Sequence, residues 1–122
     1  MVALKSFKEL IVWQESVNLV EMIYRHTQTF PEDEKFGLVS QTRRAAISIP
    51  ANIAEGYGRS NRKEYLHFLG IANGSLTELE THLIIAERIM YVTKEDIENL
   101  EGKIVVVSKL LRGLRKSLSP LP

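Results

Sequence analysis

The three histidines, His26, His67 and His82, are the first residues to consider for chemistry, because imidazole transfers protons and binds metals near neutral pH. Glu78 and His82 stand four residues apart, so on a helix they share one face and could hold a metal ion together. Di-iron bundle proteins instead use Glu-x-x-His at three-residue spacing on two helices, with further glutamates. Residues 78–82 have the wrong spacing for that motif, and residues 94–117 contain no histidine. We therefore interpret Glu78 and His82 as a surface pair and predict no metal site.

The sequence also lacks the residues that nucleophilic catalysis or cofactor chemistry would need. The chain has no cysteine, which excludes thiolate catalysis, thiolate metal sites and disulfides and fits a cytoplasmic protein. No serine, histidine and aspartate occur in a nucleophile-elbow context, and no Gly-rich phosphate loop follows a strand pattern. We predict a protein that is not an enzyme, with no catalytic residue and no cofactor. No signal peptide is recognisable, and no apolar run approaches the about 20 residues that span a bilayer, so we expect no membrane partner.

A line of polar side chains follows residues 41–55 at helical steps of three and four: Gln41, Arg44, Ser48, Asn52 and Glu55. Such a line is either a solvated face or a hydrogen-bonded junction between helices or subunits. Asn52 also falls on the apolar seam of this segment, where a polar residue costs stability unless it is paired. We favour the junction.

Four segments carry apolar residues at the alternating steps of an amphipathic helix, approximately residues 7–29, 33–57, 61–91 and 94–117. The third has the most regular seam: Tyr65, Leu69, Ala72, Leu76, Leu79, Leu83, Ala86 and Met90. Pro50 falls inside the second segment, and because the periodicity continues beyond it we predict a kink there. No stretch alternates with a period of two. Short connections favour antiparallel neighbours, so the 122 residues predict one all-α domain, an up-down-up-down four-helix bundle with a frayed tail at 118–122.

The apolar surface of the first predicted helix is wider than packing against one partner helix requires. One of its stripes reads Leu10, Trp13, Val17, Val20, Tyr24 and Thr27, and the second reads Val12, Leu19 and Ile23. A helix set deep in a small core would explain both stripes. A subunit interface formed by Val12, Leu19 and Ile23 would explain them as well. The sequence leaves both explanations open.

The bundle topology gathers distant cations at one end. The net charge is only +1, so any electrostatic binding surface must come from the distribution of charge. One end collects the start of the first helix, the connection between the second and third, and the close of the fourth. Its bases are Lys5, Lys8, Arg59, Arg62, Lys63, Lys109, Arg112, Arg115 and Lys116.

This footprint is expected of a protein that binds a phosphate backbone. The helix dipole alone explains bases near the end of the fourth helix, but it does not explain Arg62 and Lys63 at the positive start of the third. A solvated surface and a nucleic-acid site both remain open on these grounds.

Several stretches together resemble a known family. The most specific is the Ile-Pro-x-Asn-Ile-Ala-Glu-Gly run at residues 49–56, followed by Arg59 and by residues 63–81. Upstream, Trp13, residues 30–31, residues 36–38, Gln41 and residues 43–45 fit the same pattern. Over nearly its whole length the chain resembles the four-helix bundle family of the 23S rRNA intervening-sequence proteins.

The resemblance implies a bacterial homopentamer of up-down bundles around a central channel, with no catalytic residues to transfer. The architecture is also similar to that of the accessory protein of diversity-generating retroelements, a more strongly basic pentamer that binds nucleic acid and a reverse transcriptase. We therefore predict a non-enzymatic oligomer that binds RNA, or DNA, through its basic end. The alternative is a protein-interaction scaffold that docks a protein partner through the first helix or the acidic end, without nucleic acid.

Overall fold

The computed structural model describes residues 5–119, and within that range it contains four α-helices, two short 3-10 helices and no strand. The α-helices are α1 (Ile11–Thr27), α2 (Leu38–Tyr57), α3 (Arg62–Arg88) and α4 (Lys94–Leu118), and the 3-10 helices are η1 (Phe7–Glu9) and η2 (Glu32–Glu34). The all-α prediction is confirmed. Leu118, which the sequence places in a frayed tail, is the last residue of α4, and residues 120–122 of that tail lie outside the described range.

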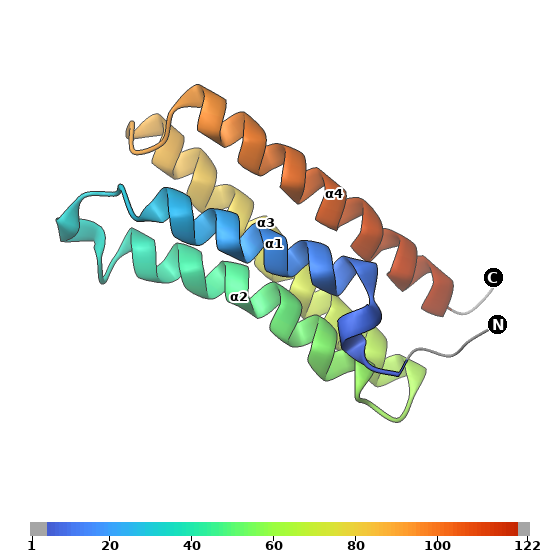
Figure 1. Ribbon diagram of the computed structural model, residues 1–122. Helices are drawn as coiled ribbons and strands as arrows, with labels where there is room; N and C mark the ends of the chain where they lie inside the picture. The colour runs from blue at the N-terminus through green and yellow to red at the C-terminus, as the bar shows by residue number, and fades with distance from the viewer. Residues whose placement is uncertain (1–4, 120–122) are drawn as a thin grey trace.

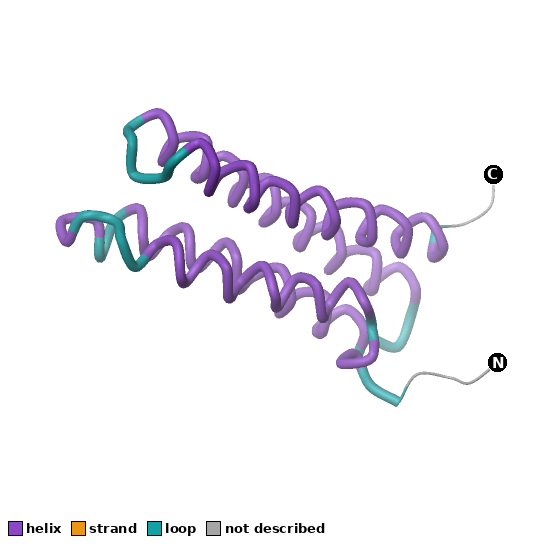
Figure 2. The backbone as a smooth tube through the Cα atoms, turned by 45° about the horizontal axis from the view of Figure 1, so that its top comes forward, coloured by secondary structure: helices purple, strands orange, loops and turns teal. Residues whose placement is uncertain are grey.

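Consecutive helices run in opposite directions, as Figure 1 shows. α1 packs against α2 and α4, and α3 packs against the same two helices, so the four surround a single core. The start of α1, the α2–α3 connection and the end of α4 lie at one end of the bundle, and the other two connections lie at the opposite end (Figures 1 and 2). This arrangement agrees with the up-down order that the sequence predicts.

α3 and α4 begin at side chains that cap them. The Asn61 side chain accepts a hydrogen bond of 2.9 Å from the backbone N–H of Glu64. Thr93 accepts one of 3.1 Å from the N–H of Asp96. Each cap satisfies a backbone donor that the first turn of a helix leaves unpaired, which fixes where the two helices start. These starts lie within a residue of the predicted ones.

α1 and α2 begin later than the sequence predicts. Ser6 caps only the short η1, and α1 itself begins at Ile11. η2 occupies the residues with which the second helix was expected to open, so α2 begins at Leu38, whose N–H donates to the Glu34 carboxylate at 3.2 Å. α2 then continues through Pro50 to Tyr57. The kink at Pro50 stays a prediction.

α3 ends earlier than expected, at Arg88, because the chain leaves the helix in a left-handed turn. Met90 has a φ of 68°, and the N–H of Tyr91 donates to the carbonyl of Ala86 at 2.9 Å. This pattern is a Schellman C-cap, in which the left-handed position is usually a glycine. The Met90 side chain is exposed, so the last residue of the predicted seam lies outside the core.

The core includes the three residues that were expected to form a subunit interface. Leu19 and Ile23 are 0% exposed and Val12 is buried as well, all within one chain. The interface expectation for these residues is wrong, because side chains already covered by their own chain offer no surface to a second subunit. The other stripe of α1 is the one left partly uncovered: Trp13, Val17, Val20 and Tyr24.

Candidate nucleic-acid interface

The nine predicted bases come from three elements that meet at one end of the bundle, which we call the basic end (Figure 1). Lys5 and Lys8 precede α1, and Arg59, Arg62 and Lys63 surround the α2–α3 connection. The last turns of α4 contribute four more: Lys109, Arg112, Arg115 and Lys116. Eight of the nine are exposed and Arg115 is half-buried. A ligand approaching this end therefore meets cations from every connecting element.

A shallow groove at the basic end lies between α3 and α4. Leu66 on α3 lines one side, and Arg112, Arg115, Lys116 and Ser119 line the other. The three cations follow one another along the last turns of a helix, where the negative end of the helix dipole favours positive charge. Within residues 5–119, no carboxylate lies within salt-bridge distance of any of the three. These cations are available to an external anion.

The carboxylates at the basic end each contact their own segment. Glu9 accepts a hydrogen bond of 3.2 Å from the N–H of Lys5. Glu64 accepts one of 3.1 Å from the Asn61 amide, as part of the α3 cap. Glu55 is the one of these three carboxylates that neutralises a predicted base, because it pairs with Arg59 one helical turn away.

Arg59 therefore has a structural role. Besides its pairing with Glu55, its guanidinium lies over the Phe68 ring at 4.6 Å from the ring centre. A cation held by a carboxylate and an aromatic face must give up both contacts before it can bind phosphate. Of the nine predicted bases, Arg59 is the one that the structure makes least available.

The polar line on α2 contributes to a junction between two helices of one chain. Ser75 on α3 donates a hydrogen bond of 2.8 Å to the Ser48 hydroxyl, and the Asn52 amide donates to the Ser48 carbonyl at 2.8 Å and to its hydroxyl at 2.9 Å. All three side chains are half-buried. Sequence reasoning missed Ser75, because nothing in its own stretch distinguishes it from a solvated serine.

The remaining members of the line lie outside this junction. Gln41 and Arg44 are exposed, and Glu55 pairs with Arg59 as described above. The line is thus a junction at Ser48 and Asn52 and a solvated face elsewhere.

Glu78 and His82 lie together as the sequence indicates, but only Glu78 lies at the surface. Glu78 is exposed, but His82 is buried, with its Nε2 at 3.5 Å from the Glu78 carboxylate and its Nδ1 without a hydrogen-bond partner. Within residues 5–119 no group of three or more His, Asp or Glu side chains is placed to hold a metal ion.

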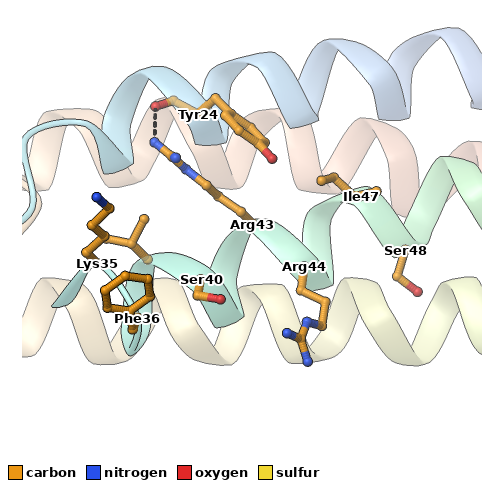
Figure 3. Close-up of a pocket in the computed structure, with 9 residues that line it drawn as sticks. Tyr24, Lys35, Phe36, Ser40, Arg43, Arg44, Ile47 and Ser48 are labelled. Carbon is orange, nitrogen blue, oxygen red and sulfur yellow. Dashed lines mark hydrogen bonds between the residues drawn. The ribbon is translucent and has the colours of Figure 1, made fainter.

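A second groove, which sequence reasoning missed, lies between α1 and α2 towards the other end of the bundle (Figure 3). Its apolar lining includes Phe36, which is 89% exposed, together with Tyr24 and Ile47. Its charged residues are all basic: Lys35, Arg43 and Arg44. The groove is therefore a cationic, apolar surface at the end of the molecule that carries most of the acids.

The two arginines of this groove differ in their contacts. Arg43 donates to the Thr27 hydroxyl at 2.9 Å and to the Tyr24 carbonyl at 3.3 Å, and its guanidinium lies 4.3 Å from the centre of the Tyr24 ring. It therefore helps to hold α2 against α1. Figure 3 shows Arg44 pointing away from α1, where it remains exposed.

The fold and the charge distribution define a class of protein: an antiparallel four-helix bundle with its bases gathered at one end. More specifically, the sequence profile of the 23S rRNA-intervening sequence proteins matches residues 8–113, and the chain belongs to that family. The resemblance drawn from residues 49–56 and their surroundings is thereby confirmed.

A solved structure supports the same assignment. It is described as a protein with unknown function from the S23 ribosomal protein family of Bacteroides thetaiotaomicron VPI-5482, and it matches with a TM-score of 0.78 and 27% identity over 87% of this chain and 96% of that chain. No curated protein matches the chain. Within residues 5–119, none of the helices is both long and apolar enough to cross a lipid bilayer.

Proposed function

We propose that this protein is a non-enzymatic RNA-binding bundle, active in the cytoplasm, that contacts the RNA backbone through its basic end. The observation that carries the proposal is the row of Arg112, Arg115 and Lys116 on α4, which lines a groove without a carboxylate in contact. The start of α3 adds two exposed cations at the same end, Arg62 and Lys63, where the helix dipole does not favour them. Their position is better explained by an anionic ligand.

The segregation of charge explains how a chain with a net charge of +1 can bind a polyanion. Phosphate contacts release condensed counterions, and the gain depends on the cations at the contact surface rather than on the net charge of the protein. Acids at the far end lie beyond a Debye length of about 10 Å at moderate salt, because a helix of this length extends roughly 30–40 Å. Their repulsion is therefore largely screened.

We further propose that the functional form is the homopentamer that the family resemblance implies. Several basic ends held in one particle would bind one RNA together, so weak individual contacts would add through effective concentration. The subunit contact cannot involve Val12, Leu19 and Ile23, because they are buried in one chain.

A salt titration tests the RNA-binding proposal. Binding of a structured RNA is measured by fluorescence anisotropy at several salt concentrations between about 50 and 200 mM, where counterion release predicts a large change in affinity. We expect log K to fall linearly with log salt. A flat plot, or no binding at the lowest salt, would contradict the proposal.

The groove between α1 and α2 favours a second candidate function, a protein-interaction scaffold. A phenylalanine that is 89% exposed, beside further apolar side chains and three bases, is typical of a surface that a protein partner covers. A second copy of this chain is the first partner to examine. If the protein is such a scaffold, nuclease treatment should not affect its capture of a partner. Capture that depends on RNA would be lost.

Two matched variants test the groove. Ile47 lines it and Ile85 lies on α3, and each is 44% exposed. If the groove is a subunit contact, Ile47→Asp lowers the mass measured by light scattering and Ile85→Asp does not. If the groove binds another protein, Ile47→Asp abolishes capture of that partner, and nuclease treatment leaves the wild-type capture unchanged. An Ile47→Asp variant with wild-type mass and wild-type capture would contradict the scaffold function.

A further inference from the structure

We infer that the RNA bound at the basic end is double-stranded, and that the protein contacts its phosphate backbone without stacking on its bases. This inference rests on the proposed function and names the substrate class of the same surface. It is drawn from the absence, among the described residues of the basic end, of an exposed phenylalanine, tyrosine or tryptophan ring on which bases could stack.

The phenylalanine, tyrosine and tryptophan rings near the basic end are packed against one another or under a cation. The Phe7 and Trp13 rings meet edge to face with centres 5.2 Å apart, and the Tyr57 and Tyr65 rings do so at 6.2 Å. Phe68 lies under the Arg59 guanidinium at 4.6 Å. All five rings are half-buried. Each of these rings is thus partly covered by its own chain.

The aromatic rings that are exposed lie elsewhere. Tyr24, near the end of α1, and Phe36, before the start of α2, are exposed at the opposite end of the bundle. His67 is the exposed ring nearest to the basic end, and its imidazole meets the edge of Phe68 at 5.3 Å. A single imidazole supplies at most one stacking position. The test below therefore includes His67.

Proteins that bind single strands depend on such platforms. Each base stacked on an aromatic side chain raises the affinity by roughly tenfold, and arginine guanidinium groups can serve in the same way. Arg59 cannot do so while Glu55 and Phe68 hold it. A single strand at the basic end would therefore find no aromatic platform like those of single-strand binders, and any stacking would fall to the guanidinium groups of Arg62, Arg112 and Arg115.

The cations suit a duplex better. Lys109, Arg112 and Lys116 lie on one rigid helix and span about 10 Å along its axis. A duplex presents a rigid array of phosphates at higher charge density, and each contact contributes about 0.9 to the salt slope, against about 0.7 for a single strand. Double-stranded RNA is also the form that proteins recognise through its backbone rather than its bases.

Two RNAs of the same strand sequence test the inference. Anisotropy is measured for a 5′-labelled duplex of about 20 base pairs, longer than the roughly 16 base pairs that known duplex-binding domains span, and for one of its strands, chosen to lack self-complementarity. At equal salt we expect the duplex to bind at least about tenfold more tightly than the strand. A second duplex of unrelated sequence should bind within about twofold of the first.

Three variants connect the result to the surface. Arg112→Gln with Lys116→Gln should weaken duplex binding at least tenfold, whereas Lys94→Gln, an exposed lysine at the other end of the same helix, should not. His67→Ala should leave the affinity for the strand unchanged. A tenfold loss of strand binding in His67→Ala would reveal stacking and overturn the inference.

The outcomes separate the inference from the proposed function. If the strand binds as tightly as the duplex and both show a salt slope, the inference fails and the RNA-binding function stands. If neither RNA binds, the proposed function fails as well.

Discussion

Ser75 on α3 donates a hydrogen bond of 2.8 Å to Ser48 on α2, across 27 positions of the chain. The Asn52 amide donates to the same hydroxyl at 2.9 Å, so Ser48 joins its own helix to the next one. The three residues form a polar contact at a half-buried position between two helices that otherwise pack through small and apolar side chains. The contact should therefore fix the register of α2 against α3.

Ser75→Ala should destabilise the fold by about 1 kcal/mol, the usual net contribution of one hydrogen bond. The loss should stay modest because Ser48 keeps its bond from Asn52. Chemical denaturation measures the change. Thr77→Ala is the control, since its exposed hydroxyl bonds only to the Asn73 carbonyl of its own helix. Equal effects in the two variants would show that the contact between α2 and α3 contributes nothing.

Gly56→Ala should destabilise the protein by about 1–3 kcal/mol, because it adds an atom at a crowded contact between helices. A Cβ at this position would lie 2.9 Å from the Phe68 Cβ and 3.2 Å from the Tyr65 carbonyl oxygen. Gly70→Ala is the matched control: nothing lies within 4 Å of its added Cβ, so the change should stabilise α3 by about 0.5–1 kcal/mol. Thermal or urea unfolding compares the two. Effects of the same sign would contradict this description of the α2–α3 contact.

Leu19→Ala should cost about 2–5 kcal/mol, as expected for a fully buried leucine. Ile11→Ala, on a side chain that is 62% exposed, should change stability by less than about 0.5 kcal/mol. The comparison tests which side of α1 faces the core, and urea unfolding measures both variants. The assignment of Leu19 to the core would be wrong if the two costs were similar.

Glu15→Gln should reduce the sensitivity of the fold to acid. Lys103 on α4 donates to the Glu15 carboxylate on α1 at 2.7 Å, and this hydrogen bond holds the pKa of Glu15 below its ordinary value of 4.5. A pKa lower in the folded chain than in the unfolded one gives stability that is present above pH 4.5 and lost as the pH falls through the folded value.

The wild-type protein should consequently lose more stability on acidification than Glu15→Gln. Urea midpoints measured from neutral pH down to below the pKa of a free carboxylate check this expectation. Parallel pH profiles for the two proteins would show that the Lys103 bridge does not contribute.

The seams of α3 and α4 were predictable because the buried residues of both helices repeat at regular helical steps. In α1 two apolar stripes compete, and the buried side of the helix carries Ser16 and also Thr27, which the sequence had placed at the end of the other stripe. Their hydroxyls donate to the carbonyls of Trp13 at 2.8 Å and Ile23 at 2.7 Å within the same helix. A polar residue that satisfies its hydroxyl in this way can enter the core, so polarity alone could not identify the buried stripe.

The start of α2 was not predictable because its cap depends on a tertiary contact. The Glu34 carboxylate accepts from the Leu38 N–H at 3.2 Å and from the Tyr91 hydroxyl at 2.9 Å, 57 positions away. The second bond also raises the pKa of the Tyr91 hydroxyl. The residues around position 33 include the acids typical of a helix start. They do not include Tyr91, the distant residue that positions Glu34.

The basic end followed from topology alone, since antiparallel order determines which connections share an end. Topology did not show which of these bases are free to bind an anion. The i, i+4 spacing of Glu55 and Arg59 is a local signal that could have excluded Arg59 from the surface. The exposure of Phe36 depends on how residues 28–37 connect two helices, and no periodicity reports it.

The measurement that tests the central claim most directly is the salt dependence of RNA binding in Arg112→Gln/Arg115→Gln/Lys116→Gln. Each of these cations that contacts phosphate contributes about 0.9 to the slope of log K against log salt on a duplex. We predict that the triple variant binds more weakly and with a correspondingly smaller slope, whereas Lys94→Gln keeps the wild-type slope. A triple variant with the wild-type affinity and slope would contradict the assignment of RNA binding to this end of the bundle.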